Sequence, residues 1–467
     1  MSREIKADYQ QLMMFPPLLE DWVGPEHPAR FIRDFVDSLD LPGLGFRVRT
    51  AAVGRPPYSA EMLLKVWLYG YLNRIRSTRQ LEHGCRENLG LIWLTGLKPP
   101  DHNTLWRFWQ DQREALRRVF RQSVQVALHA GLLQLVLHAV DGTKIQAASG
   151  RRGVWHRRDL EKALARLEAS LDQVMAEVEA AQVQERGEYR LPEELQDQAV
   201  RRQRIQEALQ MLATADRDHL HPGEPEARLM KVGAGVAPAY NAQMVADGAS
   251  GLLVAAEVVN AETDNQQLVP MLDQVQENLG ATAQETLADG GYISAAEIAR
   301  AEAQGYEVLT PAAASEEDRP YHTSRFIYDE ARDCCLCPRG QVLNYERTKT
   351  NRGKYPVKVY RCRNFRDCPV RRQCSRDPKG RQLEIGPHHQ AMERHRQKRR
   401  EKAKLLRRRK VIAEPPFAWI KRHQDFWRWT VRGLANVRTQ WALLCTTVNL
   451  KKLFRHWQVG RLILQRR

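Results

Sequence analysis

The most constraining feature of this sequence is one short segment, Leu132 to Val140 (LLQLVLHAV), which is almost continuously apolar and lies between Gly131 and Gly142. An apolar run without alternation is typical of a central strand that is buried on both faces. The segment therefore predicts a strand inside an α/β core. This predicted strand ends in an acid, Asp141.

A second acid has a similar setting. Glu285 to Ala288 predicts a short strand ending in Asp289, and Gly290-Gly291 then turns the chain into a helix from Ser294 to about Ala303. Open α/β sheets place their sites at the carboxyl ends of central strands, so Asp141 and Asp289 are candidates for one site. Because an Asp after a strand is also a common turn or capping residue, neither acid identifies a site alone.

The pattern between these acids predicts further core elements. Two apolar runs, AYNAQMVA and GLLVAAEVV, flank Asp247-Gly248 and predict a β-hairpin over 238–259. A helix is expected at about 264–279, and another short strand at Val308 to Thr310.

A third acid, Glu414, is expected to open a helix at Pro415-Pro416, because proline is tolerated in the first helical turn. Lys421 lies two turns later on the same face. Three carboxylates can hold two Mg²⁺ ions about 3.5–4 Å apart, which neutralise charge on the entering and leaving oxygens of a phosphodiester. Should Glu414 lie far from the two Asp residues, Glu257 and Glu262 are the alternatives.

The chain before Gly131 is predicted to be helical. Ser59 is expected to cap a helix that carries a buried face from Met62 to Leu72. Further helices are expected at 78–87, 89–96 and 103–128. Short helices and a tight turn before a helix with Arg107 and Arg113 are typical of a helix-turn-helix, although an ordinary helical bundle fits the spacing equally well.

Residues 157–214 are predicted to form an insertion of two helices. The first carries a heptad seam, and Leu191-Pro192 separates it from the second. The seam consists of Leu160, Leu164, Leu167, Leu171, Val174 and Val178, and the second helix carries Leu195, Ile205, Leu209 and Leu212. An antiparallel hairpin is the simplest interpretation, and a dimerising coiled coil is the alternative.

Lysine and arginine number 73 against 56 acidic residues, a net charge of +17, which favours a polyanionic partner such as nucleic acid. The segment 393–410 holds eleven basic residues and two acidic ones, too uneven for a balanced solvated face. It is expected to contact DNA phosphates. The nearby Trp419, Trp427 and Trp429 are expected in the core rather than stacked on bases.

Six of the eight cysteines fall between positions 334 and 374, and this clustering is typical of metal binding. Cys334 and Cys337 form a C-x₂-C pair that, with Cys368 and Cys374, predicts a Cys₄ zinc site. Cys335 and Cys362 are alternative ligands, and a set of buried free thiols is the alternative to zinc. Cys85 and Cys445 are expected in the core. With neither a membrane-length apolar run nor a signal-peptide pattern, we expect a cytoplasmic protein without a membrane partner.

Taken together, these motifs resemble those of bacterial insertion-sequence transposases of the DDE type, from about Tyr58 to about Leu453. VDGTKIQA and LADGGYIS resemble the first and second acidic motifs, and AEPPFAWIKR resembles the third, with Glu414 followed by Lys421. The segment from PYSAEMLL to TLWRFW resembles the helical DNA-binding domain, EARLMKVG to LVPML the hairpin and helix after the first acid, and RGLANVRTQWALLCTTVNLKKL the closing helix. Arg407 and Lys410 stand where the family commonly has a tyrosine and an arginine.

The resemblance implies an α/β RNase H-like catalytic core with an all-α N-terminal domain, a helical-hairpin insertion and a small zinc-ribbon-like insertion. The implied boundaries are 1–130 for the DNA-binding domain, 131–330 with 405–456 for the core, 150–225 for the hairpin, 330–390 for the cysteine-rich insertion and 393–410 for the basic DNA-contacting segment.

The resemblance also implies an activity. Metal-activated water would cleave at the ends of the element, and the freed 3′-hydroxyl would attack target DNA. Two Mg²⁺ or Mn²⁺ ions would be held by Asp141, Asp289 and Glu414, with Lys421 on a phosphate and a structural Zn²⁺ on the cysteines. The partners would be double-stranded DNA, both the terminal inverted repeats of the element and the target, and further copies of the same chain. The protein would associate with the nucleoid. Residues expected to bind DNA are Arg107, Arg407, Arg408, Arg409 and Lys410.

Two alternatives share most of these features. One is a metal-dependent nuclease on the same core, which would cut DNA without joining it. The other is an inactive, transposase-derived DNA-binding protein, whose expected mark is a lost carboxylate. All three acids are present here, which favours an active enzyme.

Overall fold

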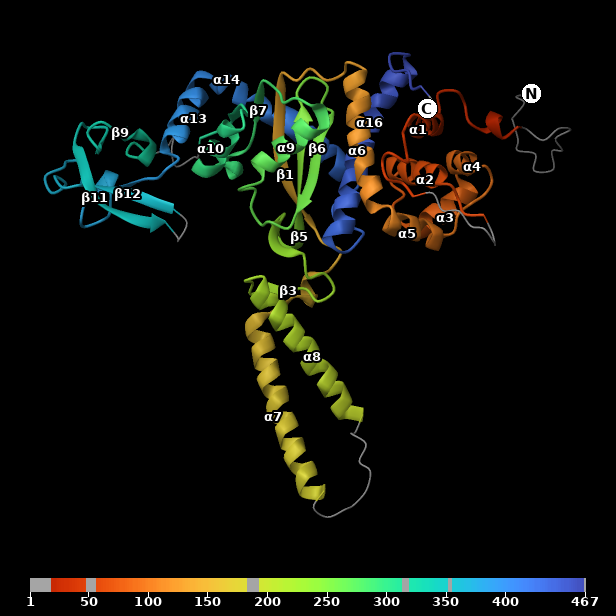
Figure 1. Cartoon of the computed structure of the whole chain (residues 1–467), viewed down its shortest axis with the longest axis horizontal. Helices are drawn as coiled ribbons and strands as arrows, with labels where there is room; N and C mark the ends of the chain where they lie inside the picture. The colour runs from red at the N-terminus through yellow and green to blue at the C-terminus, as the bar shows by residue number, and fades with distance from the viewer. Residues whose placement is uncertain (1–17, 48–55, 183–192, 313–318, 352–354, 466–467) are drawn as a thin grey trace, which may run out of the picture. The chain divides into compact units, whose positions relative to one another are not determined.

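The chain folds into two compact units in a computed structural model (Figure 1). The structure describes residues 18–47, 56–182, 193–312, 319–351 and 355–465. One unit combines Met1–Ala130 with Ile420–Arg467, and the other is Gly131–Trp419. No helix in these described ranges is long and apolar enough to cross a membrane.

The first unit is helical throughout its described residues. Its elements are the 3₁₀ helix η1 (Leu19–Trp22), α1 (Pro28–Asp37), α2 (Ala60–Leu72), α3 (Thr78–Glu87), α4 (Leu89–Thr95), α5 (His102–Asp111), α6 (Arg113–His129) and α16 (Leu434–Gln458). The predicted cap is confirmed, because the Ser59 hydroxyl accepts a hydrogen bond from the Met62 N–H. Sequence periodicity missed α1, whose buried face includes Phe31 and Phe35.

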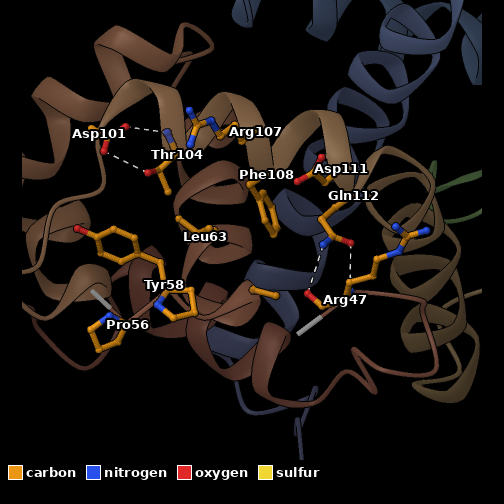
Figure 2. Close-up of a pocket in the computed structure, with 12 residues that line it drawn as sticks. Arg47, Pro56, Tyr58, Leu63, Asp101, Thr104, Arg107, Phe108, Asp111 and Gln112 are labelled. Atoms are coloured by element: carbon orange, nitrogen blue, oxygen red, sulfur yellow. Dashed lines mark hydrogen bonds between the residues drawn. The ribbon is translucent and has the colours of Figure 1, made fainter. Parts of the chain in front are cut away.

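The single helix expected at 103–128 is wrong, because the chain breaks between α5 and α6. Gln112 leaves the helical conformation, and its side-chain amide pairs with the backbone of Arg47 at 3.1 and 3.3 Å (Figure 2). Asp101 caps α5 by accepting the Thr104 N–H at 2.7 Å. A long-range pairing therefore ends a helix that the local pattern would continue.

Helix α16, which the sequence placed with the catalytic core, packs against α6, α2 and α1. Trp67, Trp109 and Trp441 are fully buried in this unit, and the Trp109 indole donates a hydrogen bond to Asn436 on α16. Trp429 is also buried, as expected, but Trp427 is 56% exposed, so the core prediction is wrong for that residue.

The second unit is built on a mixed sheet with strand order β4-β5-β1-β7-β8, in which β6 also pairs with β5. Its strands are β1 (Leu137–Gln146), β4 (Arg228–Val232), β5 (Gly235–Asp247), β6 (Leu253–Val259), β7 (Glu285–Leu287) and β8 (Val308–Leu309). β5 is antiparallel to β1, β4 and β6, whereas β1, β7 and β8 are mutually parallel. The β-hairpin predicted over 238–259 is confirmed, and this mixed α/β arrangement fits the general RNase H-like core.

Strand β1 differs from its prediction at both ends. It starts only at Leu137, because Gly131 and Leu135 have positive φ and turn the chain before it. It also continues past Asp141 to Gln146, because β5 pairs with it along this whole length. Asp141 therefore lies in the middle of the strand rather than at its end.

Helices cover this sheet, and one of them departs from expectation. They are α9 (Leu268–Leu279), α10 (Ala295–Ala303), α13 (His389–Glu401), α14 (Ala403–Leu406) and α15 (Arg408–Ala418), with 3₁₀ turns η2 (Arg151–Gly153) and η3 (Gly290–Tyr292). α15 packs on β1 and β5. Pro415 and Pro416 lie inside it, so Glu414 does not open the helix as predicted. The buried Ile412, Ala413 and Phe417 hold this face of α15 in place, and a π-helix (Trp419–His423) follows.

The predicted insertion forms α7 (Arg157–Gln182) and α8 (Glu193–Thr214), which lie side by side beyond the short pair of β2 (Trp155–His156) and β3 (His219–Leu220) (Figure 1). Leu160 of the seam is buried against Ile205, Ala208 and Leu212, with Leu164 and Leu167 beside them. The described part of the seam thus packs within the chain. The side chains of Leu171, Val174, Val178 and Leu195, and the break at Leu191-Pro192, lie outside the described residues.

The cysteine-rich segment forms a separate antiparallel sheet of order β13-β12-β11-β10-β9. Its elements are η4 (Thr323–Arg325), β9 (Ile327–Asp329), β10 (Cys334–Leu336), β11 (Val342–Asn351), β12 (Tyr355–Cys362), α12 (Arg371–Cys374) and β13 (Gln382–Ile385). Its small core contains Phe326, Leu343, Tyr360 and Leu383 together with Cys335 and Cys362.

Candidate active site

Two of the predicted acids are brought together by strand register. In the parallel pair of β1 and β7, Ala139 lies opposite Leu287. Asp141 and Asp289 each follow two residues later, so they come level with each other where β7 has ended and β1 continues. Asp289 itself is still extended and is followed by η3, which begins at Gly290. The 141 carboxylate is 20% exposed and the 289 carboxylate 51%, so this position is open to solvent.

A single cation lies between these acids. The guanidinium of Arg409, on α15, is 3.2 Å from Asp141 Oδ2 and 3.4 Å from Asp289 Oδ1. Burial raises the pKa of Asp141, the negative charges of Asp289 and Asp264 add to the rise, and the Gly142 N–H and Arg409 oppose it. Positive charge between the two carboxylates is therefore favourable, and Arg409 supplies that charge here. Carboxylate oxygens are the ligands that Mg²⁺ prefers, so the pair fits a divalent metal.

The other two predicted catalytic residues lie on separate elements. Glu414 is exposed on α15. Lys421 lies in the π-helix, with its Nζ 6.0 Å from the centre of the Trp427 ring. Within the described ranges, no three Asp, Glu, His or Cys side chains are close enough together to hold a metal ion. Of the alternatives, Glu257 bonds to the Val258 N–H, and Glu262 lies in the electrostatic environment of Arg217.

Two protein-family models match the chain: Transposase domain (DUF772) over residues 17–111 and Transposase DDE domain over residues 336–454. Both matches are to transposase domains, and together they support an insertion-sequence DDE transposase. A search of curated proteins finds no match. The DDE match includes Glu414 and Lys421 but starts beyond Asp141 and Asp289, so only the register and the contacts above bring these two acids together.

The chain has an acid beside this pair that sequence reasoning missed. Asp264, in the segment between β6 and α9, lies close enough to Asp141 to raise its pKa. Its own carboxylate bonds to Asn241 and Gln243 of β5 at 2.7 and 2.8 Å. The available signal was on β5, where an Asn and a Gln two residues apart interrupt an otherwise apolar strand and so mark a polar face.

Acidic residues of the same unit partly neutralise the basic segment 393–410. Arg394 pairs with Glu302 at 2.6 and 2.8 Å, and both Lys398 and Lys402 pair with the buried Glu285. Arg409 forms ion pairs with Asp141 and Asp289. The exposed remainder of the predicted DNA-contacting set in this segment is Arg407, Arg408 and Lys410.

Arg107, the other predicted DNA contact, is exposed on α5. It lines a cavity of about 230 Å³ with Arg47, Tyr58, Phe108 and Asp111 (Figure 2). Acidic and basic side chains both line this cavity, so Arg107 lies near acids as well as near another base.

The cysteines separate into two groups. Burial raises the pKa of the Cys374 thiol, and neighbouring Cys368, Cys337 and Cys362 add to this rise, so these four lie within electrostatic range of one another. The Cys337 Sγ accepts the N–H groups of Arg339 and Gln341, both at 3.3 Å. Cys334, of the predicted ligand set, instead raises the pKa of its buried neighbour Cys335. Cys85 and Cys445 are buried, as expected.

The two glycines that follow the acids give a matched test of this geometry. A Cβ at Gly142 would overlap the Gln243 amide and lie 3.0 Å from Asp264 Oδ1, whereas a Cβ at Gly290 would meet nothing within 4 Å. We expect Gly142→Ala to lower the free energy of unfolding by about 1–3 kcal/mol, the usual cost of overpacking. Gly290→Ala should leave it nearly unchanged. Thermal unfolding of both variants checks this, and equal midpoints would contradict it.

Proposed function

We propose that this chain is a DNA transposase that cleaves phosphodiester bonds at the ends of its element and joins the freed 3′-hydroxyl groups to target DNA. The observation that carries the proposal is the level placement of Asp141 and Asp289 around a cation, at an open position of an RNase H-like sheet. The two transposase family matches supply the context of DNA rearrangement.

Asp141, Asp289 and Glu414 would hold two Mg²⁺ or Mn²⁺ ions. Bound there, such ions neutralise charge on the entering and leaving oxygens of the phosphodiester. Asp141 is oriented for this role by the Gly142 N–H, which donates to its Oδ1 at 2.8 Å. Asp289 is more exposed and can meet the ions from solvent. Arg409 would exchange its present carboxylate partners for DNA phosphate when the ions bind.

The remaining residues bind and orient DNA. Lys421 would hold a phosphate near the cleaved bond, and Arg407, Arg408, Lys410 and Arg107 would contact the backbone of double-stranded DNA. Because these contacts are charge pairs, they position the terminal repeats and the target without reading their sequence. Two DNA ends must be processed and joined, so we propose that the enzyme acts as a homo-oligomer on DNA.

Substitution of the acids tests the proposal directly. Asp141→Asn, Asp289→Asn and Glu414→Gln should each lower cleavage and joining of element-end DNA by at least about 10²-fold, the scale seen when one catalytic group is removed. DNA binding should be retained. Glu262→Gln is the matched control and should keep activity.

A gel assay that resolves cut from joined products gives the contradicting outcomes. Cutting by the wild type without joining indicates a nuclease, and neither reaction indicates an inactive DNA-binding protein. Full activity of Glu414→Gln with loss in Glu262→Gln would move the third carboxylate to Glu262.

Some arginines of the basic segment form ion pairs inside the fold and others do not, which predicts that two exposed arginines contribute differently to the salt dependence of DNA binding. Arg408→Ala should weaken DNA binding and reduce the slope of log K against log salt by about 0.9, the value for one phosphate contact. Arg394→Ala should change the slope less, since this residue already pairs with Glu302. Fluorescence anisotropy titrations at several salt concentrations measure both, and equal slopes for the two variants would contradict this difference.

We further propose that the cysteine-rich sheet holds a structural zinc ion on Cys337, Cys362, Cys368 and Cys374. Two observations support this set: the four thiols lie within electrostatic range of one another, and two backbone N–H groups donate to the Cys337 Sγ. In this set Cys362 replaces Cys334, which the sequence predicted. A closed Cys₄ site would stabilise a sheet whose own apolar core is small.

Zinc content decides between the two ligand sets. The purified protein should carry about one zinc per chain in elemental analysis, as a closed Cys₄ site binds one ion. Cys362→Ser should lose it, whereas Cys334→Ser and Cys85→Ser should retain it. Loss in Cys334→Ser with retention in Cys362→Ser would restore the sequence-predicted set, and a zinc-free wild type would contradict the proposal.

A further inference from the structure

Asp264 is the centre of a polar network beside the two acids. Its Oδ1 accepts hydrogen bonds from Lys144 Nζ and Asn241 Nδ2, both at 2.7 Å, and from Gln243 Nε2 at 2.8 Å. Burial opposes ionisation of Asp264, but the bonds from Lys144 and Asn241 outweigh it and lower its pKa. Asp264 is therefore an anion whose charge is matched by Lys144.

The network fixes the strand that carries Asp141. Lys144 is on β1, three residues beyond that acid, and its cross-strand partner in β5 is Asn241. In the same register Gly142 lies opposite Gln243, and a Cβ at position 142 would lie 3.0 Å from Asp264 Oδ1. The glycine after Asp141 thus leaves the space that this carboxylate occupies.

The network also reaches the turn that carries Asp289. The Gln243 amide, held by Asp264, accepts a hydrogen bond from the hydroxyl of the fully buried Tyr292. Tyr292 ends η3, and its N–H donates to the Asp289 carbonyl at 3.1 Å. A Cβ at Gly291 in the same turn would lie 3.5 Å from Asp264 Oδ2. One carboxylate therefore lies beside both the strand glycine that follows Asp141 and the η3 turn that follows Asp289.

We propose that Asp264 is a positioning residue that sets the separation of Asp141 and Asp289, acting on the first through Lys144 and Gly142 and on the second through Gln243 and Tyr292. This inference rests on the proposed function, because the separation matters only if the two acids share metal ions. Burial and the surrounding acids raise the pKa of Tyr292, so its hydroxyl keeps the proton that it donates.

Because Asp264 is charged, an asparagine at this position could not replace it in the network. An Asn there would present one oxygen and one N–H₂ group to three donors, and Lys144 would lose its anionic partner. Without the Lys144 ion pair, the part of β1 that carries Asp141 would be held less firmly. Outer partners of metal ligands commonly contribute about 10–100-fold in metal affinity.

The experiment measures Mn²⁺ binding to the full chain without DNA by isothermal titration calorimetry. Asp264→Asn and Tyr292→Phe should each weaken Mn²⁺ binding by about 10–100-fold. The combined variant should lose less than the product of the single losses, because both act through Gln243. Asp273→Asn is the matched control: this Asp accepts a bond from the Tyr306 hydroxyl at 2.7 Å outside the site, and its loss should leave Mn²⁺ affinity unchanged.

Circular dichroism confirms folding, and Tyr292→Phe keeps the test available if Asp264→Asn does not fold. Wild-type Mn²⁺ affinity in folded Asp264→Asn and Tyr292→Phe, with loss in Asp141→Asn, would overturn the positioning role and leave the proposed function standing. Unchanged Mn²⁺ affinity in Asp141→Asn would overturn the proposed function itself.

Discussion

The parallel pairing of β1 with β7 is the constraint on which the candidate site depends. Because Ala139 lies opposite Leu287, the next two residues of each segment bring Asp141 and Asp289 level. A slip of one residue in either strand would turn its side chains to the other face of the sheet. The long antiparallel partner β5 prevents that slip, since it pairs with β1 from His138 to Gln146 and fixes its register.

Positive charge has three separate roles in this molecule. Arg409 neutralises the two acids, Arg394 and its neighbours hold α13 to the sheet edge through glutamates, and the exposed remainder of the basic segment is left for a polyanion. The net charge of +17 already subtracts the acids of these ion pairs, so it measures the excess of basic residues that have no acid to cancel them. The residues that form ion pairs inside the fold and the exposed residues proposed to bind DNA come from the same segment, 393–410, and differ in the direction of their side chains.

Much of the fold and the meeting of Asp141 with Asp289 were predictable from the sequence, and the failures share one cause. The Ser59 cap, the hairpin over 238–259 and the strand before Asp289 were found because turn chemistry and periodicity act over a few residues. The helix at 103–128 broke at Gln112 because its side chain pairs with Arg47, 65 residues away. Asp264 was missed because an acid between a strand and a helix is ordinary until the polar face of β5 is placed against it.

The sequence by itself determined that the chain has an α/β core after a helical region, and its motifs identified three acids and a basic run. Only the tertiary structure decided which charges meet. Arg409 lies 268 residues from the Asp141 that it contacts, and Lys144 lies 120 residues from Asp264. No local pattern carries that information, because the separation between such groups is set by strand register and by the packing of α15 on the sheet.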